Sequence, residues 1–451
     1  MKYLAEVLSC RDPASVCWYS SDGTVETVGA MRAALRARDD SEWQGRKVAL
    51  GRMPSLDLFR TLVLLDGVVD CLLFLPQEQE RTILDTVIAD MQIDVALGEG
   101  NKANLLAIPR SQTVPDEQAT LLERAKWRKT QWILPTSGTT GTPKFIRHTF
   151  ETLTRRMSRR DLGDTYIWGS LYSPRRFAGL QVFLQSWIAC NPLILNDDLE
   201  ISADLLRQLA RLGCNALSAT PSMWRKLSMC RGFESLALKQ ITLGGEMADQ
   251  PILDLLRRCF PDARITHIYA STEAGVGFAV NDGLTGFPAT LLEHSTKSPA
   301  IRVDVAGHLW LSTEAGADEA PIAASPVTEG WVDSGDVFQR TGDRFFFRGR
   351  ASGTINVGGN KVMPEEVEAV IKEVPGVAFV LVKGRKSPIM GSLVEAHVVT
   401  NDGVVFDEQF TRSIAAHCRS RLEAFKVPAF VKPMNRIDLN AAGKISRKDA
   451  A

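Results

Sequence analysis

The segment of this 451-residue chain with the densest potential for chemistry runs from Thr136 to Lys144 and reads TSGTTGTPK. It holds five hydroxyl side chains, two glycines and a lysine within nine residues. Glycine lets the backbone adopt positive φ and approach an anion closely, hydroxyl and amide groups donate to phosphate oxygens, and a lysine adds a point charge. A flexible polar loop would explain the glycines and hydroxyls but not the terminal Pro-Lys. We therefore interpret the segment as a phosphate-binding loop.

Two later segments place a carboxylate beside hydroxyl or glycine residues. Tyr269–Glu273 reads YASTE, and Gly330–Asp336 reads GWVDSGD. A carboxylate next to a hydroxyl suits magnesium and phosphate, because Mg²⁺ prefers hard oxygen ligands. A carboxylate such as that of Asp336 can also accept from both hydroxyls of a ribose. Taken alone, Thr272 and Glu273 are better explained as the N-cap pair of a helix, and Gly330–Asp336 fits an acidic turn.

Glycine-containing turns carry the remaining candidates. Gly244-Gly245-Glu246 follows an apolar segment, and NVGGNK at Asn356–Lys361 follows Arg350. Asn440–Arg447 reads NAAGKISR, and its Lys444 could neutralise charge that develops on an acyl carboxylate and a phosphate. Each of these segments, taken alone, also fits an ordinary turn or a solvated lysine.

The order of these segments resembles that of the adenylate-forming superfamily, which includes acyl- and aryl-CoA synthetases, peptide-synthetase adenylation domains and beetle luciferases. TSGTTGTPK resembles the superfamily's phosphate loop, while YASTE, GWVDSGD and NAAGKISR resemble its YGxTE, GWxxTGD and C-terminal GK motifs. Six such matches occur in the superfamily's order between Thr136 and Arg447. Ala270, Ser334 and Ser352 are mild departures from the usual residues.

The resemblance implies a role for each candidate residue. The catalytic residues would be Lys444, Glu273 and Thr272, with Mg²⁺ held by Glu273. The residues implied to bind ATP or AMP are Thr136, Ser137, Gly138, Thr139, Thr140, Gly141, Lys144, Gly245, Glu246, Tyr269, Asp336 and Arg350. Ser352 would be a hinge, and the implied thiol tunnel contains Gly358 and Gly359. The implied acyl pocket contains Phe177, Ala219 and Gly244.

Many CoA ligases of the superfamily carry a PxFHxxG-like segment along the acyl site. The similar segment here is Pro174–Gly179, PRRFAG, in which Phe177 takes the histidine position and two arginines precede it. One hypothesis is that Arg175 or Arg176 pairs with a second carboxylate on the substrate. We favour the alternative that both arginines are solvated, since arginine is rarely buried unpaired.

The implied reaction uses ATP, Mg²⁺ and coenzyme A. A small carboxylic acid becomes an acyl-adenylate, a mobile C-terminal domain rotates about the hinge, and coenzyme A takes the acyl group as a thioester. The protein would then be an acid–thiol ligase. An alternative is a stand-alone ligase that loads the acyl group onto the phosphopantetheine of a carrier protein in trans. A third possibility is a catalytically idle nucleotide-binding scaffold, although Lys444 and Glu273, whose loss would favour it, are both present.

Composition argues against several other classes. Lys and Arg number 53, as do Asp and Glu, so a general binder of nucleic acid or of anionic membrane is not expected. The most apolar stretch, 62–76, contains Asp66 and Asp70 and is too short to span a bilayer, and no signal peptide is evident. The eight cysteines are dispersed without a CxxC motif. We expect a cytoplasmic protein with free thiols, monomeric or homodimeric.

The elements that must position these residues alternate between strands and helices over the first 260 residues. We predict strands within 47–50, 68–74, 94–97, 193–195, 216–219 and 236–243, and helices over 30–38, 55–65, 78–90, 181–188 and 202–212. Such alternation predicts parallel sheets covered by helices.

The remainder of the chain has a different pattern. We predict strands within 301–305, 308–312, 344–347, 377–383 and 394–400, and helices over 364–373 and 406–422. The fold class is therefore α/β, with a large N-terminal domain of parallel-rich sheets plus a β-rich subdomain, followed by a small α+β domain. We place the ATP- and acid-binding domain at 1–349, the hinge at 350–352 and the C-terminal domain with the catalytic lysine at 353–451.

Overall fold

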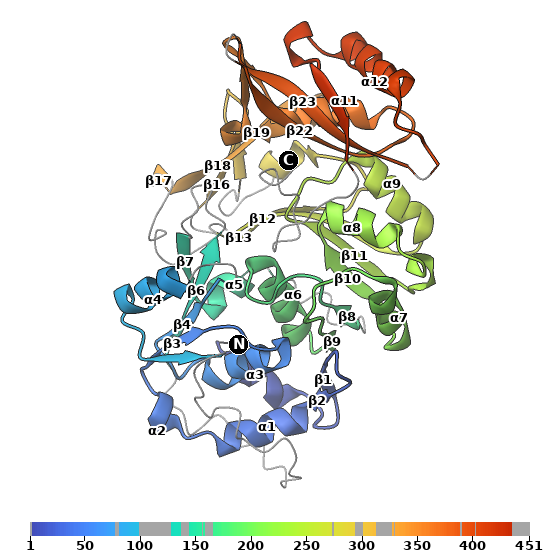
Figure 1. Cartoon of the computed structure of the whole chain (residues 1–451). Helices are drawn as coiled ribbons and strands as arrows, with labels where there is room; N and C mark the ends of the chain where they lie inside the picture. The colour runs from blue at the N-terminus through green and yellow to red at the C-terminus, as the bar shows by residue number, and fades with distance from the viewer. Residues whose placement is uncertain are drawn as a thin grey trace. The chain divides into compact units, whose positions relative to one another are not determined.

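A computed structural model describes most of the chain (Figure 1). The described residues are 2–76, 81–98, 128–136, 144–155, 157, 166–272, 275–293, 301–312, 327–328, 330–387, 390–401 and 403–434. The chain divides into two compact units, 1–284 with 312–332 and 285–311 with 333–451. Across the described ranges, no helix is long and apolar enough to cross a membrane.

The first unit contains a five-stranded sheet with the order β5-β3-β4-β6-β7. Its strands are β3 (Lys47–Leu50), β4 (Cys71–Phe74), β5 (Val95–Leu97), β6 (Gln131–Thr136) and β7 (Lys144–His148). β3, β4, β5 and β6 run parallel, and β7 pairs antiparallel with β6. All four residues of β4 are buried, as expected for a strand in the interior of a parallel sheet.

An eight-stranded sheet completes the first unit, with the order β13-β12-β11-β10-β8-β9-β1-β2. Its strands are β1 (Val16–Tyr19), β2 (Val25–Thr27), β8 (Trp168–Gly169), β9 (Leu193–Ile194), β10 (Ala216–Ala219), β11 (Gln240–Gly244), β12 (Arg264–Ser271) and β13 (Gly275–Val280). The strands from β12 to β1 run parallel, and the edge strands β13 and β2 are antiparallel to their neighbours.

Helices connect the parallel strands. They are α1 (Val28–Ala37), α2 (Asp40–Trp43), α3 (Ser55–Leu65), α4 (Arg81–Asp90), α5 (Phe150–Thr154), α6 (Phe177–Ile188), α7 (Ala203–Arg211), α8 (Pro221–Ser228) and α9 (Gln250–Cys259), with short 3₁₀ turns at η1 (Leu4–Cys10) and η5 (Phe233–Ser235). In Figure 1, α8 and α9 lie beside β10, β11 and β12.

Side-chain caps fix where α8 and α9 begin. The Thr220 hydroxyl accepts from the Met223 amide at 3.1 Å, and the Asp249 carboxylate accepts from the Ile252 amide at 3.2 Å. Both caps satisfy amides that the first helical turn leaves unpaired. Because β10 ends at Ala219, the first turn of α8 starts directly at the end of that strand.

Aromatic side chains dominate one part of the first unit's core. The rings of Trp18 and Trp187 stack with centroids 5.2 Å apart, and those of Phe59 and Phe183 stack at 4.2 Å. All four are almost completely buried. Buried aromatic pairs at these separations contribute both area and specific ring contacts, so β1, α3 and α6 pack as one body.

The second unit begins with a β-rich part. Its sheet has the order β14-β19-β18-β16-β15, and β17 pairs with the start of β18. The elements of this sheet are β14 (Phe287–Pro288), β15 (Ile301–Val303), β16 (His308–Ser312), β17 (Val327–Thr328), β18 (Trp331–Thr341) and β19 (Arg344–Arg350), with α10 (Thr290–Glu293) after β14. Of these, β17 and the first two residues of β18 are grouped with the first unit. The ring of Phe287 lies between those of Phe338 and Phe345, with centroids 5.2 Å away in each case.

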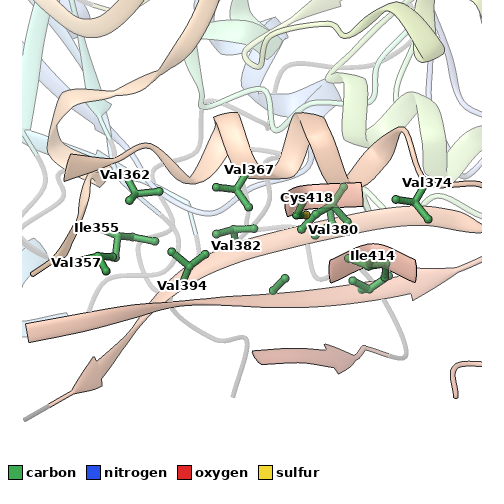
Figure 2. Packing of buried hydrophobic residues seen from close by; sticks show 13 residues of the cluster. Ile355, Val357, Val362, Val367, Val374, Val380, Val382, Val394, Ile414 and Cys418 are labelled. Atoms are coloured by element: carbon green, nitrogen blue, oxygen red, sulfur yellow. The ribbon is translucent and has the colours of Figure 1, made fainter. Parts of the chain in front are cut away.

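An α+β layer forms the C-terminal part of the second unit. It comprises η7 (Ala351–Gly353), β20 (Ile355–Val357), β21 (Asn360–Val362), α11 (Pro364–Lys372), β22 (Val377–Ser387), β23 (Gly391–Thr400), α12 (Glu408–Arg421), η8 (Ala424–Lys426) and β24 (Phe430–Pro433). Figure 2 shows its core, where Val367 of α11 and Ile414 of α12 pack onto alternate residues of β22 and β23, such as Val382 and Val394. The intervening residues Phe379 and Leu381 of β22 are buried as well, so this part of the strand is apolar on both faces.

These observations confirm the predicted α/β fold class, and the later part of the chain has the predicted different pattern, although β18, β22 and β23 are long strands. Helix 55–65 and strand 308–312 have the predicted bounds. α6 begins at Phe177, earlier than predicted, although it contains the poor helix former Gly179. A Cβ at Gly179 would lie 2.2 Å from the Ser173 carbonyl oxygen, so close packing requires glycine there. The boundary near residue 350 remains a prediction, since the contacts group the β-rich part with the C-terminal part.

Candidate active site

The predicted phosphate loop connects two antiparallel strands. β6 ends at Thr136, β7 begins at Lys144, and these two residues lie opposite each other in the ladder. Ser137, Gly138, Thr139, Thr140 and Gly141 lie outside the described residues. The apolar residues before the loop do form a strand, as predicted. The hydroxyl and lysine at the two ends of the segment are therefore neighbours at the edge of the five-stranded sheet.

Three other predicted residues lie at the carboxyl ends of neighbouring strands in the eight-stranded sheet. Ala219 ends β10, Gly244 ends β11, and Thr272 directly follows β12. The three strands are parallel and adjacent, so their carboxyl ends lie at the same edge. In open α/β sheets this edge is where ligands bind. Residues predicted for the acyl pocket and for the nucleotide thus lie at the same end of the sheet, with Thr272 four residues beyond Ile268, the residue opposite Gly244.

The turn after β11 has a conformation that depends on glycine. Gly245 has a φ of +80°, a backbone conformation that residues with a side chain rarely adopt. The Glu246 carboxylate accepts from the Ser222 amide at 3.0 Å, in the first turn of α8. A carboxylate is stabilised at this position by the free amides and the helix dipole. Glu246 therefore fastens the turn to α8, while its predicted part in ATP binding remains a prediction.

Tyr172 is a polar residue at this edge that sequence reasoning missed. Its hydroxyl donates to the Gly244 carbonyl oxygen at 3.4 Å. Burial raises its pKa well above the usual value, so the hydroxyl stays protonated and remains a donor. A signal was present, because Tyr172 lies shortly after an apolar strand and before the Pro174–Gly179 segment.

His267 is a second residue that sequence reasoning missed. It lies within β12, and its Nε2 accepts from the Ala248 amide at 3.4 Å, just beyond the glycine turn. Burial lowers the pKa of His267 to about 4, so the imidazole is neutral near pH 7 and can accept. Tyr172 and His267 therefore support the backbone on either side of Gly245.

Thr272 occupies a hairpin rather than a helix start. Ser271 pairs with Gly275 in the antiparallel ladder of β12 and β13, so the alternative that Thr272 and Glu273 cap a helix is wrong. Glu273 itself lies outside the described residues. The Thr272 carbonyl oxygen accepts from Nε2 of His148, 2.7 Å away, at the end of β7. This bond joins the strand that follows the phosphate loop to the end of β12.

Tyr269 and Phe177 each make an aromatic contact near the end of β12 or β7. The Tyr269 ring stacks on Phe278 of β13 with centroids 5.1 Å apart. Phe177, the first residue of α6, lies with its ring 6.0 Å from that of His148. Both aromatic residues are buried. The histidine therefore packs against a residue predicted for the acyl pocket and bonds to one predicted for the phosphate.

Arg175 corrects our preferred interpretation that both arginines are solvated. Its side chain is 3% exposed. Its Nε donates to the Gly51 carbonyl oxygen at 3.1 Å, and its Nη2 donates to that of Met53 at 3.2 Å. Burial lowers its pKa to about 10, which still leaves it charged near pH 7. The reason is structural: the chain beyond β3 has carbonyl groups that need donors, and Arg175 supplies them.

In the second unit, two residues predicted to bind the ribose contact each other. Nε of Arg350 lies 2.8 Å from a carboxylate oxygen of Asp336, across β18 and β19. The Asp336 side chain is 7% exposed and that of Arg350 is 56% exposed. The Ser334 hydroxyl accepts from the Asp336 amide at 3.1 Å and donates to the Leu309 carbonyl at 2.7 Å. Serine thus supplies the hydroxyl expected from threonine at this position.

Three further predicted residues of the second unit lie between β19 and α11. Ser352 belongs to the exposed 3₁₀ turn η7. Gly358 and Gly359 form the turn between β20 and β21, with φ values of +58° and +91°. The Asn356 carboxamide oxygen accepts from the Gly359 amide at 3.0 Å, which closes that turn. Lys444 lies outside the described residues, and the roles predicted for all these residues remain predictions.

A metal site is not formed by the described residues alone, since no three His, Cys, Asp or Glu side chains among them lie together suitably. The predicted magnesium ligand, Glu273, falls outside that set.

Comparison with known proteins identifies the family. The AMP-binding enzyme family matches residues 69–308, and the AMP-binding enzyme C-terminal domain matches 366–444. A 2-succinylbenzoate–CoA ligase from Geobacillus kaustophilus is 26% identical over 391 residues, which cover 80% of this chain and 76% of the relative. Surfactin synthase subunit 1 from Bacillus subtilis is 24% identical over 421 residues, 83% of this chain but only 11% of that protein.

The fold agrees with that of a solved ligase. The structure of o-succinylbenzoate CoA synthetase from Bacillus subtilis, in complex with an acyl-adenylate intermediate, superposes with a TM-score of 0.72 at 19% identity. The superposition covers 100% of this chain and 99% of that one. The chain therefore belongs to the AMP-binding enzyme family, and it is an adenylate-forming acid–thiol ligase.

Proposed function

We propose that this ligase activates an aromatic carboxylic acid with ATP and transfers the acyl group to coenzyme A. The observation that carries this proposal lies at the carboxyl ends of three adjacent parallel strands, where Ala219 and Gly244 end β10 and β11 and Thr272 follows β12. His148 connects this edge to the strand that follows the phosphate loop. Phosphate-binding and acyl-binding candidates therefore converge in one unit.

An aromatic acid is favoured by the residues near this edge and by the relatives. Phe177 and Tyr172 are buried close to it, and aromatic rings pack well against other rings. The 2-succinylbenzoate–CoA ligase relative acts on an acid with a benzene ring. Arg175 is engaged with the carbonyls of Gly51 and Met53. We therefore do not assign it to a second carboxylate of the substrate.

In the first half-reaction, a carboxylate oxygen of the acid attacks the α-phosphorus of ATP. The new bond joins acyl oxygen to phosphorus, and the bond from the α-phosphorus to the bridging oxygen breaks as pyrophosphate leaves. Positioning and charge neutralisation carry such a step. We assign Lys144 and Thr136 to the phosphates, Thr272 to the α-phosphate, and Lys444 to the developing charge. Asp336 and Arg350 would hold the ribose.

In the second half-reaction, the sulfur of coenzyme A attacks the acyl carbon, and AMP leaves with the oxygen that joined it to the acyl group. We infer that the C-terminal domain, 353–451, rotates about Ser352 between the two steps. Lys444 would then leave the site, and Gly358 and Gly359 would line the path of the thiol. A glycine turn with positive φ keeps such a path free of side chains.

We assign a magnesium ion to Glu273. A carboxylate following a threonine is the type of oxygen ligand that Mg²⁺ prefers, and the ion would supply charge neutralisation on the phosphates. The proposal predicts that chelation of divalent cations abolishes pyrophosphate release from ATP.

The decisive experiment measures pyrophosphate release from ATP with a panel of aromatic, fatty and dicarboxylic acids, with and without coenzyme A. We expect an aromatic acid to stimulate release, coenzyme A to accelerate turnover, and Lys444→Ala to lose adenylation. The exposed Lys239 gives a matched control, since Lys239→Ala removes a lysine charge at the surface and should leave the rate unchanged. Release that coenzyme A does not affect would favour a carrier protein as the acceptor. No release with any acid, while ATP still binds, would favour an idle nucleotide-binding scaffold.

A further inference from the structure

The contact between His148 and Thr272 joins two separate sheets. His148 ends β7 in the five-stranded sheet, and Thr272 follows β12 in the eight-stranded sheet, 124 residues further along the chain. Nε2 of His148 lies 2.7 Å from the Thr272 carbonyl oxygen. β7 carries Lys144 at its other end, so a single hydrogen bond connects the strand of the phosphate loop to the segment predicted to contact the α-phosphate.

The protonation of the imidazole follows from its partner. A carbonyl oxygen can only accept, so Nε2 must carry the hydrogen. His148 Nδ1 lies 3.5 Å from the Thr152 hydroxyl, which also takes part in the capping box of α5 with Thr149. The side chain is 1% exposed, so water does not compete for the donor. His148 is therefore held in the tautomer and orientation that suit Thr272.

Packing restrains the ring from another side. The Phe177 ring lies 6.0 Å from that of His148, with an interplanar angle of 36°. Phe177 belongs to α6, while Thr152 belongs to α5. Elements from three parts of the first unit thus fix one imidazole. A side chain restrained in this way can transmit the position of one strand to another, because it has no alternative rotamer without a cavity or an unpaired group.

We propose that His148 is a positioning residue that holds the Thr272 backbone in register with the phosphate-loop hairpin. This inference rests on the proposed function, since Thr272 and the loop are assigned there to the phosphates of ATP. Loss of the Nε2 donor would take this partner from the partly buried Thr272 carbonyl and free the Thr272 segment to shift. The consequence is weaker binding of ATP, with little change in binding of the acid.

Two variants distinguish the contribution of the Nε2–H donor of His148 from that of its aromatic ring. His148→Phe retains an aromatic ring of similar size against Phe177 but has no donor. His148→Gln carries an amide nitrogen close to the place of Nε2 and can still donate to the carbonyl. We expect His148→Phe to raise the KM for ATP and the ATP dissociation constant about tenfold, as for loss of one buried hydrogen bond. We expect His148→Gln to stay within about threefold of the wild type.

The measurements are steady-state kinetics for ATP and acid, calorimetric titration with ATP, and the thermal midpoint of each variant without ligand. His417→Gln, which changes a histidine of the second unit that pairs with Glu373, is the matched control and should leave all values unchanged. A KM for ATP that is unaltered in His148→Phe would overturn the proposal. So would equal losses in the two variants, since a purely structural role would lower the thermal midpoint without distinguishing a donor from a ring.

The test remains informative if parts of it fail. Should His148→Phe not fold, His148→Met and His148→Gln give the same comparison, because they are similar in length and differ in the donor. Should the wild type release no pyrophosphate with any acid, the proposed function fails. The calorimetric titration with ATP would then still test His148 separately.

Discussion

The predicted site residues of the two units are held in different ways. In the first unit, polar side chains form hydrogen bonds with backbone atoms: Glu246 accepts from the Ser222 amide, and Tyr172 donates to the Gly244 carbonyl. In the second unit, Asp336 and Arg350 pair with each other, side chain to side chain, and the arginine is half exposed. The residues of the first unit are therefore bonded to the backbone, whereas Asp336 and Arg350 of the second unit are bonded to each other.

This difference indicates which of the predicted site residues can give up a protein partner and bind a ligand instead. A buried hydrogen bond to the backbone has no substitute when it breaks, so it keeps a site preorganised. In the Asp336–Arg350 pair the arginine is half exposed, so water or a ligand can take its place beside the carboxylate. We therefore expect changes in the first unit to cost stability, and changes at Asp336 or Arg350 to affect nucleotide binding with little cost in stability.

The largest effect on the free energy of unfolding is expected at Arg175. Arg175→Met removes the donors for the Gly51 and Met53 carbonyls while retaining much of the side-chain volume. Because those buried carbonyls lose their partner, the free energy of unfolding should fall by about 3 kcal/mol, measured by urea denaturation. Arg207→Gln, on the exposed surface of α7, is the control and should change it by less than about 0.5 kcal/mol. A similarly small loss for Arg175→Met would remove the distinction between the two units.

The second effect concerns pH and Asp66, which supports the strand before the phosphate loop. Its carboxylate accepts from the Leu4 amide at 2.9 Å and from the Trp132 indole at 3.0 Å. Burial raises the pKa of Asp66 to about 7 in the folded protein, above its ordinary value of 3.8. The folded state then binds a proton more tightly than the unfolded state between these values. This carboxyl therefore favours folding at low pH, and its contribution falls as the pH rises from about 4 to about 7.

Asp66→Asn tests this dependence. The amide cannot accept from both N–H groups, so we expect a loss of about 1–2 kcal/mol in unfolding free energy at pH 5. The difference in unfolding free energy between the variant and the wild type should narrow by pH 8, because the variant has no titrating group at position 66. Asp70→Asn, which alters the exposed pair with Arg128, should show no such trend. A gap that stays constant from pH 5 to pH 8 would contradict the assignment.

A smaller effect on stability is expected at Arg350. Arg350→Gln replaces the charged partner of the largely buried Asp336 by an amide that can still donate, and because the arginine itself is half exposed we expect a change of about 1 kcal/mol in unfolding free energy. The KM for ATP should nevertheless rise. The proposed contrast fails if the variant loses stability and keeps its affinity for ATP.

The smallest effect sets the scale for exposed pairs in the second unit. Arg412 and Glu408 form an ion pair one helical turn apart on α12, and both side chains are largely exposed. Arg412→Ala should change the unfolding free energy by about 0.3 kcal/mol, and added salt should remove the difference. A change as large as that expected for Arg175 would show that exposed pairs of this unit are more important than their geometry indicates.

The sequence predicted those elements whose signals are local. The predicted helix 55–65 and strand 308–312 have the observed bounds, while the phosphate loop, indicated by its glycine, hydroxyl and lysine residues, remains a prediction. These signals depend on neighbours a few residues apart. The order of the motifs then identified the superfamily, which the comparisons confirmed.

Contacts between distant segments could not be predicted in this way. The Arg-Arg pair at 175–176 is typical of a solvated surface, and nothing nearby shows that Arg175 reaches the Gly51 carbonyl, 124 residues earlier. The bond from His148 to Thr272 likewise joins two sheets whose relative register is set by packing, not by local pattern. The supporting residues Tyr172 and His267 were missed for the same reason.

The aromatic core of the first unit has a spectroscopic consequence. Trp18 and Trp187 stack 5.2 Å apart, and the chain has no tryptophan or tyrosine after Trp331. Tryptophan fluorescence and near-ultraviolet dichroism therefore observe mainly the first unit, while far-ultraviolet dichroism observes the backbone of both. A reporter tryptophan introduced after residue 352 would have no other indole in that segment. Its anisotropy and quenching could then follow the C-terminal segment through each turnover.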